Sequence, residues 1–213
     1  MDIESVFFDM DGVVIESEKL HLQALGMTLE ANGISFDRAI LDQFVGKSDW
    51  SFFQYAYQHL DDRIDIEYYL KEKDLHFESL ISDLQFVKGF PGFMRAVKEA
   101  KLRTALVTSS TSQTVQKVDK VLHFTHQFDL VITADDTSTH KPSPEPYLLA
   151  LERTGSNKAR TMIIEDSSYG IIAGKAAGCI VCGLTTSFDA AILKDAGADL
   201  TSDNYRELHL SLQ

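Results

Sequence analysis

Residues 7–12 read FFDMDG, so Asp9 and Asp11 stand two positions apart where an apolar run ends. The run before them is typical of a buried strand, and Gly12 directly after them favours a tight turn. A strand of this kind would deliver both carboxylates to one point at its carboxyl end. The stretch therefore predicts a site that uses two closely spaced acids.

The same pattern recurs along the chain, because short apolar runs end in small polar or acidic residues and are followed by helix-like stretches. Near-continuous apolar runs fit strands that are covered on both faces, and their alternation with helices predicts an α/β fold with a Rossmann-like parallel sheet. In such sheets, ligands bind at the carboxyl ends of the strands. The five runs are SVFFDMDG (5–12), TALVTSS (104–110), DLVITADD (129–136), TMIIEDSS (161–168) and CIVCGLTTS (179–187).

The stretch between the first two runs is about seventy residues long and has no comparable strand, which is too long for an ordinary connection. Its apolar residues recur at helical spacing, and Asp37, Ser48 and Asp65 can each cap a helix. We therefore expect a core domain, residues 1–16 and 85–213, with an inserted helical domain, residues 17–84. Pro91 lies between two glycines in KGFPG and marks the return to the core.

Composition excludes several classes of partner. The chain has 32 acidic and 20 basic residues and a net charge of -12, which argues against binding to nucleic-acid phosphates or anionic lipid. No apolar run approaches the ~20 residues of a membrane span, and Asp2 and Glu4 stand where a signal peptide would be basic. We expect a cytoplasmic monomer that acts on a small molecule.

Two pairs of residues have the spacing of metal ligands, but we interpret both pairs as structural residues. Cys179 and Cys182 could form a redox or metal pair on spacing alone, but the chain has no other cysteine to complete a zinc site. Their neighbours predict a buried strand with cysteine as a small hydrophobe. His123 and His126 are interpreted as residues at a helix end.

The groups at the predicted strand ends are suited to phosphoryl transfer, because neighbouring parallel strands lie only ~4.8 Å apart. Asp9 and Asp166 could hold Mg²⁺, which binds through oxygen and bridges readily to phosphate. Lys141 supplies a fixed positive charge, and Thr108 with the backbone around Ser109 supplies neutral donors.

A cation is required on electrostatic grounds. A carboxylate and a phosphate oxygen ~4 Å apart repel by roughly 4 kcal/mol at an effective dielectric of 20. With cations in place, one aspartate can attack phosphorus while a second manages the proton on the leaving or entering oxygen.

These residues resemble, in order, the four motifs of the haloacid dehalogenase-like superfamily. The motifs are DMDGVV (9–14) with Ser17, then Thr108, then Lys141–Pro142, and last Glu165–Asp166. The resemblance covers essentially the whole chain, and the helical insert resembles the family's small α-helical cap. Among the branches, the chain is most similar to the β-phosphoglucomutase-like phosphatases, which share EDS and a KP followed by further prolines.

The resemblance implies a role for each carboxylate of the first motif. Asp9 would be the nucleophile that forms an aspartyl-phosphate. Asp11 would be the general acid and base, and its backbone carbonyl would bind Mg²⁺. An aspartate at position 11 favours phosphoryl transfer over dehalogenation, since the dehalogenase branch lacks this second carboxylate.

The later motifs would hold the phosphoryl group and the metal. Thr108 and Lys141 would bind the transferring phosphoryl group. Asp166 would be a metal ligand, and Glu165 would bind the metal directly or in its outer shell.

Substrate selection would belong to the cap. Gly46 and Lys47 stand where a cap loop of the family is expected, and Lys47 could meet a second anionic group of the substrate or be a solvated turn residue. His21 matches a position that assists catalysis in β-phosphoglucomutases, although a histidine on a helix face is more often structural. The mutases carry an arginine where this chain has Asp49, which favours hydrolysis.

The sequence thus predicts a Mg²⁺-dependent phosphohydrolase acting on a small phosphorylated metabolite, with a sugar phosphate as the expected substrate. A phosphomutase is the first alternative. A phospho-accepting signalling domain of the receiver type is an alternative from another class, although receivers are shorter and lack a large insert after the first strand. Dehalogenation comes last.

Overall fold

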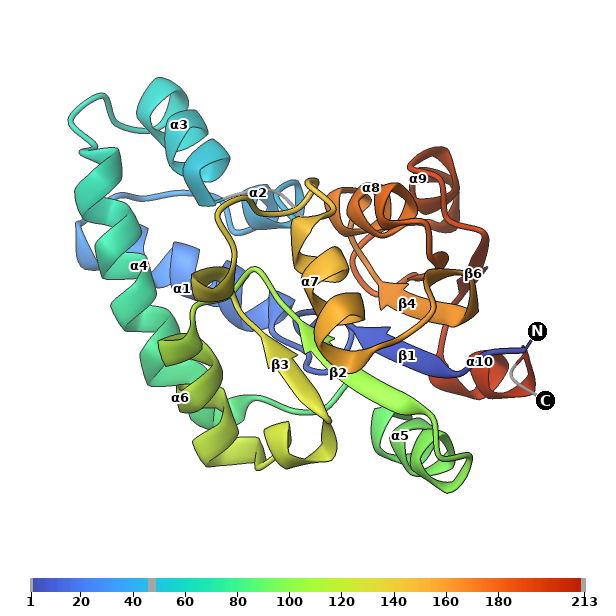
Figure 1. Cartoon of the computed structure of the whole chain (residues 1–213). Helices are drawn as coiled ribbons and strands as arrows, with labels where there is room; N and C mark the ends of the chain where they lie inside the picture. Colours follow the sequence, from blue (N-terminus) through green and yellow to red (C-terminus); the bar gives the residue numbers. More distant parts are fainter. Residues whose placement is uncertain (1, 46–48, 212–213) are drawn as a thin grey trace. The chain divides into compact units, whose positions relative to one another are not determined.

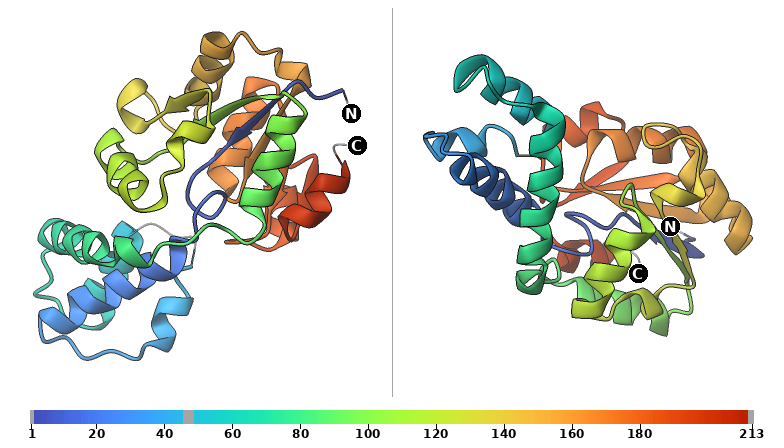
Figure 2. Two further views of the ribbon diagram at one scale, coloured as in Figure 1. Left: turned by 90° about the horizontal axis from the view of Figure 1, so that it is seen from below. Right: turned by 90° about the vertical axis from the view of Figure 1, so that its left-hand side faces the viewer.

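A computed structural model describes residues 2–45 and 49–211. The chain forms two compact units (Figures 1 and 2). One, here called the core unit, comprises Met1–Glu16 and Gln85–Gln213, and the other, the helical unit, comprises Ser17–Leu84.

Within the described residues, six parallel strands form one sheet in the core unit, in the order β3-β2-β1-β4-β5-β6 (Figure 1). The predicted α/β fold with a parallel sheet is confirmed, and β6 is a strand that the apolar pattern did not predict. It has only three residues, two of them polar, so it carries no apolar run. The strands are β1 (Ser5–Phe8), β2 (Arg103–Val107), β3 (Leu130–Ile132), β4 (Thr161–Glu165), β5 (Ile180–Leu184) and β6 (Leu200–Ser202).

Helices cover both faces of this sheet. Figures 1 and 2 show α7 and α8 over one face and α5 with α10 over the other. The helices of the core unit are α5 (Phe90–Glu99), α6 (Ser112–Leu122), α7 (Glu145–Thr154), α8 (Ser168–Ala177), α9 (Ala190–Asp195) and α10 (Tyr205–Ser211).

Phe7 and Phe8 show why the first run is apolar at every position. Successive strand residues point to opposite faces, and both rings are fully buried. Phe7 belongs to the cluster that includes Tyr147 of α7 and Ile171 of α8. Phe8 instead makes an edge contact with Phe90 of α5, with ring centroids 5.8 Å apart. A sheet covered on both faces therefore produces a continuous apolar run.

Strand register aligns the carboxyl ends of the central strands. Phe8 of β1 pairs with Leu106 of β2 and with Ile164 of β4, so Asp9 and Glu165 follow at the same level. The strand order reverses between β1 and β4, which is the place where open α/β sheets bind ligands.

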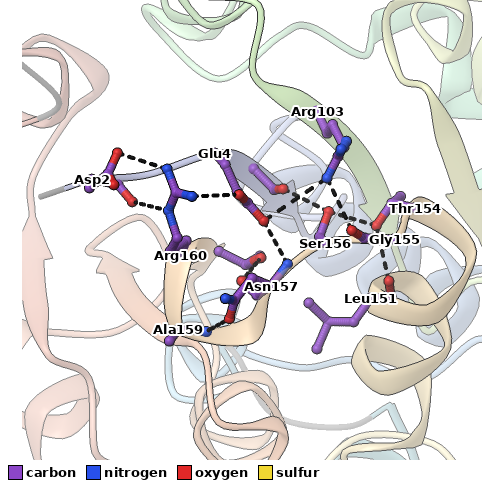
Figure 3. Close-up of polar contacts among 12 residues, drawn as sticks. Asp2, Glu4, Arg103, Leu151, Thr154, Gly155, Ser156, Asn157, Ala159 and Arg160 are labelled. Carbon is purple, nitrogen blue, oxygen red and sulfur yellow. Dashed lines mark hydrogen bonds and ion pairs between the residues drawn. The ribbon is translucent and has the colours of Figure 1, made fainter.

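A network of ion pairs and hydrogen bonds joins the opposite, amino ends of the same strands (Figure 3). The Glu4 carboxylate accepts from the Asn157 amide at 2.7 Å and pairs with the Arg160 guanidinium at 3.1 Å. Arg103, at the start of β2, donates to the Gly155 carbonyl at 3.1 Å. These contacts join β1, β2 and β4 at the end that carries no catalytic motif.

The helical unit has a core of its own. Leu25 and Leu29 pack with Phe52 and Phe53, and all four are buried. Asp65 caps α4 as the sequence predicts, because its side chain accepts from the Tyr68 amide. The predicted cap Ser48 lies outside the described residues. The helices are α1 (Glu18–Ala31), α2 (Ala39–Asp42), α3 (Asp49–His59) and α4 (Ile66–Leu80).

The structural interpretation of the cysteines is confirmed. Cys179 and Cys182 are free and buried, and burial raises the pKa of each thiol to about 12. His123 follows the last residue of α6. Among the residues that the structure describes, no helix has both the length and the hydropathy needed to cross a bilayer.

Candidate active site

Lys141 is the centre of the polar cluster at the carboxyl end of the sheet. Its ammonium donates to Asp9 Oδ1 at 2.5 Å, to Glu165 Oε1 at 2.6 Å and to the Val107 carbonyl at 2.9 Å. These three bonds use all the donors of the ammonium. Burial lowers the pKa of Lys141, but the carboxylates of Asp9 and Glu165 outweigh it and hold the pKa well above its usual range.

Three carboxylates cluster at this point, and two of them, Asp9 and Glu165, pair with Lys141. Oxygen atoms of Asp9, Glu165 and Asp166 lie within 4.8 Å of one another. Burial, together with the negative charges of Glu165 and Asp11, raises the pKa of Asp9 to about 8 against the attraction of Lys141. Burial and the negative charges of Asp9 and Glu165 also raise the pKa of Asp166. One ammonium does not neutralise this cluster, so its charge and its oxygen donors fit a hard divalent cation.

The three carboxylates are not equally available to such a cation. Glu165 Oε1 accepts from Lys141 and from the Tyr147 hydroxyl, the latter at 2.8 Å. Its Oε2 accepts from the amides of Asp166 and Ser167, each at 3.2 Å, and from the Ser167 hydroxyl at 3.0 Å. These five bonds occupy both oxygens, so the geometry favours an outer-shell place for Glu165 and direct coordination by Asp9 and Asp166.

The loop after β2 supplies hydroxyl groups. Thr108 is buried, and its hydroxyl accepts from the Ser110 amide at 3.0 Å. The Ser110 hydroxyl donates to Asp11 Oδ2 at 3.3 Å. Ser109, the predicted neighbour of Thr108 in phosphate binding, is exposed.

The loop after β5 holds the first motif and Asp166 in place. The Thr186 hydroxyl donates to the Gly12 carbonyl at 2.6 Å, and the Ser187 hydroxyl donates to Asp166 Oδ2. Gly12 has φ +70°, and a Cβ there would lie 1.8 Å from Asp166 Oδ2. The glycine of FFDMDG is therefore required both by the turn and by the close approach of this carboxylate.

In the helical unit, the half-buried His21 belongs to a polar cluster around Lys73. Its Nδ1 lies 2.8 Å from the Lys73 ammonium, and its ring stacks on Phe77 with centroids 4.0 Å apart. The side chain of Lys73 is only 2 % exposed and pairs with Asp49 at 2.6 Å. The two other predicted substrate residues, Gly46 and Lys47, lie outside the described residues.

Four residues that hydrogen-bond to the first motif or to the predicted metal ligands were not singled out by the sequence pattern. Three of them, Ser110, Thr186 and Ser187, follow apolar runs directly, so the rule that ligands bind at strand ends could have found them. Tyr147 lies inside a helix, and no local signal connects it with Glu165. The predicted roles of Asp9, Asp11, Thr108, Ser109 and Lys141 stay predictions.

Comparison with known proteins identifies the family. The family profile described as haloacid dehalogenase-like hydrolase matches residues 6–184. A phosphorylated carbohydrates phosphatase from Thermotoga maritima is 29 % identical over 201 residues, which is 92 % of either chain. The fructose-1-phosphate phosphatase YqaB of Escherichia coli is 29 % identical over 175 residues, covering 81 % of this chain and 92 % of YqaB.

A solved structure agrees with these matches. A HAD family hydrolase from Deinococcus radiodurans, crystallised with bound phosphate and sodium, superposes with a TM-score of 0.84 at 26 % identity and covers 99 % of this chain and 95 % of its own. The profile match spans the core strands that carry all four motifs. The chain belongs to the haloacid dehalogenase-like hydrolases, and it is a phosphatase of that family.

Proposed function

We propose that the protein is a Mg²⁺-dependent phosphohydrolase that removes phosphate from a small phosphorylated metabolite, with a sugar phosphate as substrate, through a phospho-Asp9 intermediate. The observation that carries the proposal is the cluster of Asp9, Asp166 and Glu165, in which Asp9 and Glu165 pair with one buried lysine. Relatives described as phosphatases of phosphorylated carbohydrates and of fructose-1-phosphate support this substrate class.

Bound Mg²⁺, held by Asp9, Asp166 and the Asp11 carbonyl, would offset the repulsion between the carboxylates and the phosphate. An Asp9 oxygen attacks phosphorus, the Thr108 hydroxyl donates to an equatorial oxygen, and the positive charge of Lys141, held 2.5 Å from Asp9 Oδ1, offsets the negative charge that develops. The Asp11 carboxyl, oriented by Ser110 at 3.3 Å, protonates the departing alkoxide and then takes a proton from the water that hydrolyses phospho-Asp9.

The helical unit would select the leaving group, and its internal ion pair favours hydrolysis over mutase activity. Lys73 is already paired with Asp49 at 2.6 Å. A mutase must hold a second phosphate of its substrate, which requires an uncompensated positive charge. Neither Asp49 nor Lys73 supplies such a charge, and the proposal assigns one phosphate per substrate to this protein.

The test is release of inorganic phosphate from a panel of sugar phosphates and related monophosphates, with Mg²⁺ and with a chelator. We expect release that needs Mg²⁺ and that falls by more than about 10³-fold in Asp9→Asn. Asp195→Asn, the same change at an exposed residue of α9, should behave as wild type. Normal turnover in Asp9→Asn would disprove the mechanism, and isomerised sugar phosphate without free phosphate would identify a mutase.

A further inference from the structure

Tyr147 touches both partners of the Lys141–Glu165 ion pair, although it lies outside the four motifs. It is fully buried in α7, and its hydroxyl donates to Glu165 Oε1 at 2.8 Å. The Lys141 ammonium lies 5.0 Å from the centroid of its ring, within cation–π distance. A buried phenol needs a hydrogen-bond partner, and here that partner is a carboxylate of the active site.

Both oxygens of the Glu165 carboxylate, which Tyr147 contacts, accept hydrogen bonds. Oε2 of Glu165 is fixed by the turn that begins α8, through two amides and the Ser167 hydroxyl. Oε1 has only two donors, the Lys141 ammonium and the Tyr147 hydroxyl. Within the described residues, the Tyr147 hydroxyl is thus the only neutral donor to Oε1, and it directs this oxygen toward the lysine.

We propose that Tyr147 is a positioning residue for phosphoryl transfer. Its hydroxyl orients Glu165, and Glu165 with the Tyr147 ring fixes the Lys141 ammonium beside Asp9, where the phosphoryl group is transferred. The inference rests on the proposed function. Residues that orient charged groups in this way commonly contribute 10- to 100-fold to metal affinity or activity.

Tyr147→Phe tests the proposal because it removes the hydroxyl and keeps the ring and its packing. Glu165 would keep its other four hydrogen bonds, but Oε1 would lose the neutral donor that orients it toward Lys141, so the ammonium would be held less exactly beside Asp9. We expect kcat to fall about tenfold while KM stays within twofold, because the hydroxyl acts on the transition state through Lys141 and not on substrate binding.

Tyr205→Phe is the matched control. Tyr205 is also buried, and its hydroxyl donates to a main-chain carbonyl, that of Val13, at the same 2.8 Å. Both variants lose one buried hydrogen bond from a tyrosine, so both should lower the midpoint of thermal unfolding. In Tyr205→Phe, kcat should stay within twofold of wild type. Thermal melts of both variants fix an assay temperature at which each is folded.

Orthovanadate binding gives a readout that does not need turnover. Vanadate adopts the geometry of the transferring phosphoryl group, so its affinity in the presence of Mg²⁺ should fall about tenfold in Tyr147→Phe, in parallel with kcat. Calorimetric Mg²⁺ affinity should stay within threefold, because Tyr147 contacts neither Asp9 nor Asp166 in the proposed ligand set.

The possible outcomes distinguish failure of the positioning role of Tyr147 from failure of the proposed function. If wild type is active and Tyr147→Phe loses no more kcat and vanadate affinity than Tyr205→Phe, the positioning role is wrong. A loss of Mg²⁺ affinity without a loss of kcat or of vanadate affinity would also contradict the positioning role. If wild type releases no phosphate, the proposed function fails first.

Discussion

A single glycine decides where the Glu165 carboxylate can lie. A Cβ on Gly170 would come within 1.7 to 2.2 Å of the carboxyl atoms of Glu165. Because Glu165 is fully buried and makes five hydrogen bonds, it cannot move aside without breaking several of them. Gly170 therefore contributes to the active site by having no side chain.

Gly170→Ala should displace Glu165 and, with it, Lys141. We expect kcat to fall by more than about 100-fold, and the free energy of unfolding to fall by about 2 kcal/mol, because bonds to a buried charged group are lost. Phosphate release and urea unfolding measure the two effects.

Gly92→Ala is the control for this substitution. Gly92 is the third residue of α5, as Gly170 is of α8, and beyond its chain neighbours and its own helix backbone no described atom lies within 4 Å of its hypothetical Cβ. Alanine there should raise the free energy of unfolding by about 0.5 kcal/mol and leave kcat unchanged. Equal kcat values for the two variants would show that Glu165 need not hold this position.

The ends of the strands bring the reactive groups together, and the loop after β5 orients them. Asp9 follows β1, Thr108 follows β2, and Asp166 follows β4, while Ser187 follows β5 and donates to Asp166. Parallel strands align these loops at one edge of the sheet, so the fold itself positions groups that are far apart in sequence.

Ser187→Ala should weaken Mg²⁺ binding about tenfold, because the serine hydroxyl orients a proposed metal ligand. The Mg²⁺ dissociation constant is measured by calorimetry, and kcat at saturating Mg²⁺ should stay within threefold. Thr185→Val is the control in the same loop, since the Thr185 hydroxyl donates to Asp203 at 2.7 Å. A Ser187→Ala protein with wild-type Mg²⁺ affinity would contradict this role.

The helical unit interrupts the core at one place, where its two connections leave side by side. The Glu16 amide donates to the Gln85 carbonyl at 2.9 Å, and the Val87 amide donates to the Val14 carbonyl at 3.0 Å. Each unit also has its own buried apolar cluster. A short linker could therefore replace the insert without a large entropic cost.

Replacing residues 17–84 with a four-residue Gly/Ser linker should give a core that unfolds cooperatively and still binds Mg²⁺. Its preference for the best sugar phosphate over p-nitrophenyl phosphate, as a ratio of kcat/KM values, should fall about 100-fold if the insert carries the groups proposed to select the leaving group. Thermal melts and kinetics on both substrates measure this. An unchanged ratio would place substrate selection in the core.

The strands, the insert and the acids that follow the strands were predictable because each depends on residues close together in the chain. Apolar runs such as Ser5–Phe8 reflect burial on both faces, and a glycine directly after Asp11 reflects a local turn. Strand β6 was not predictable in this way, since its three residues become a strand only by pairing with β5.

Contacts between distant residues required the folded chain. Tyr147 and Glu165 are 18 positions apart on a helix and a strand, and Ser187 and Asp166 are 21 apart. No periodicity or turn signal encodes such pairs, because each arises when α7, α8 and the loop after β5 pack on the same sheet. Local patterns thus specify which groups reach the active site, and packing specifies which neighbours hold them there.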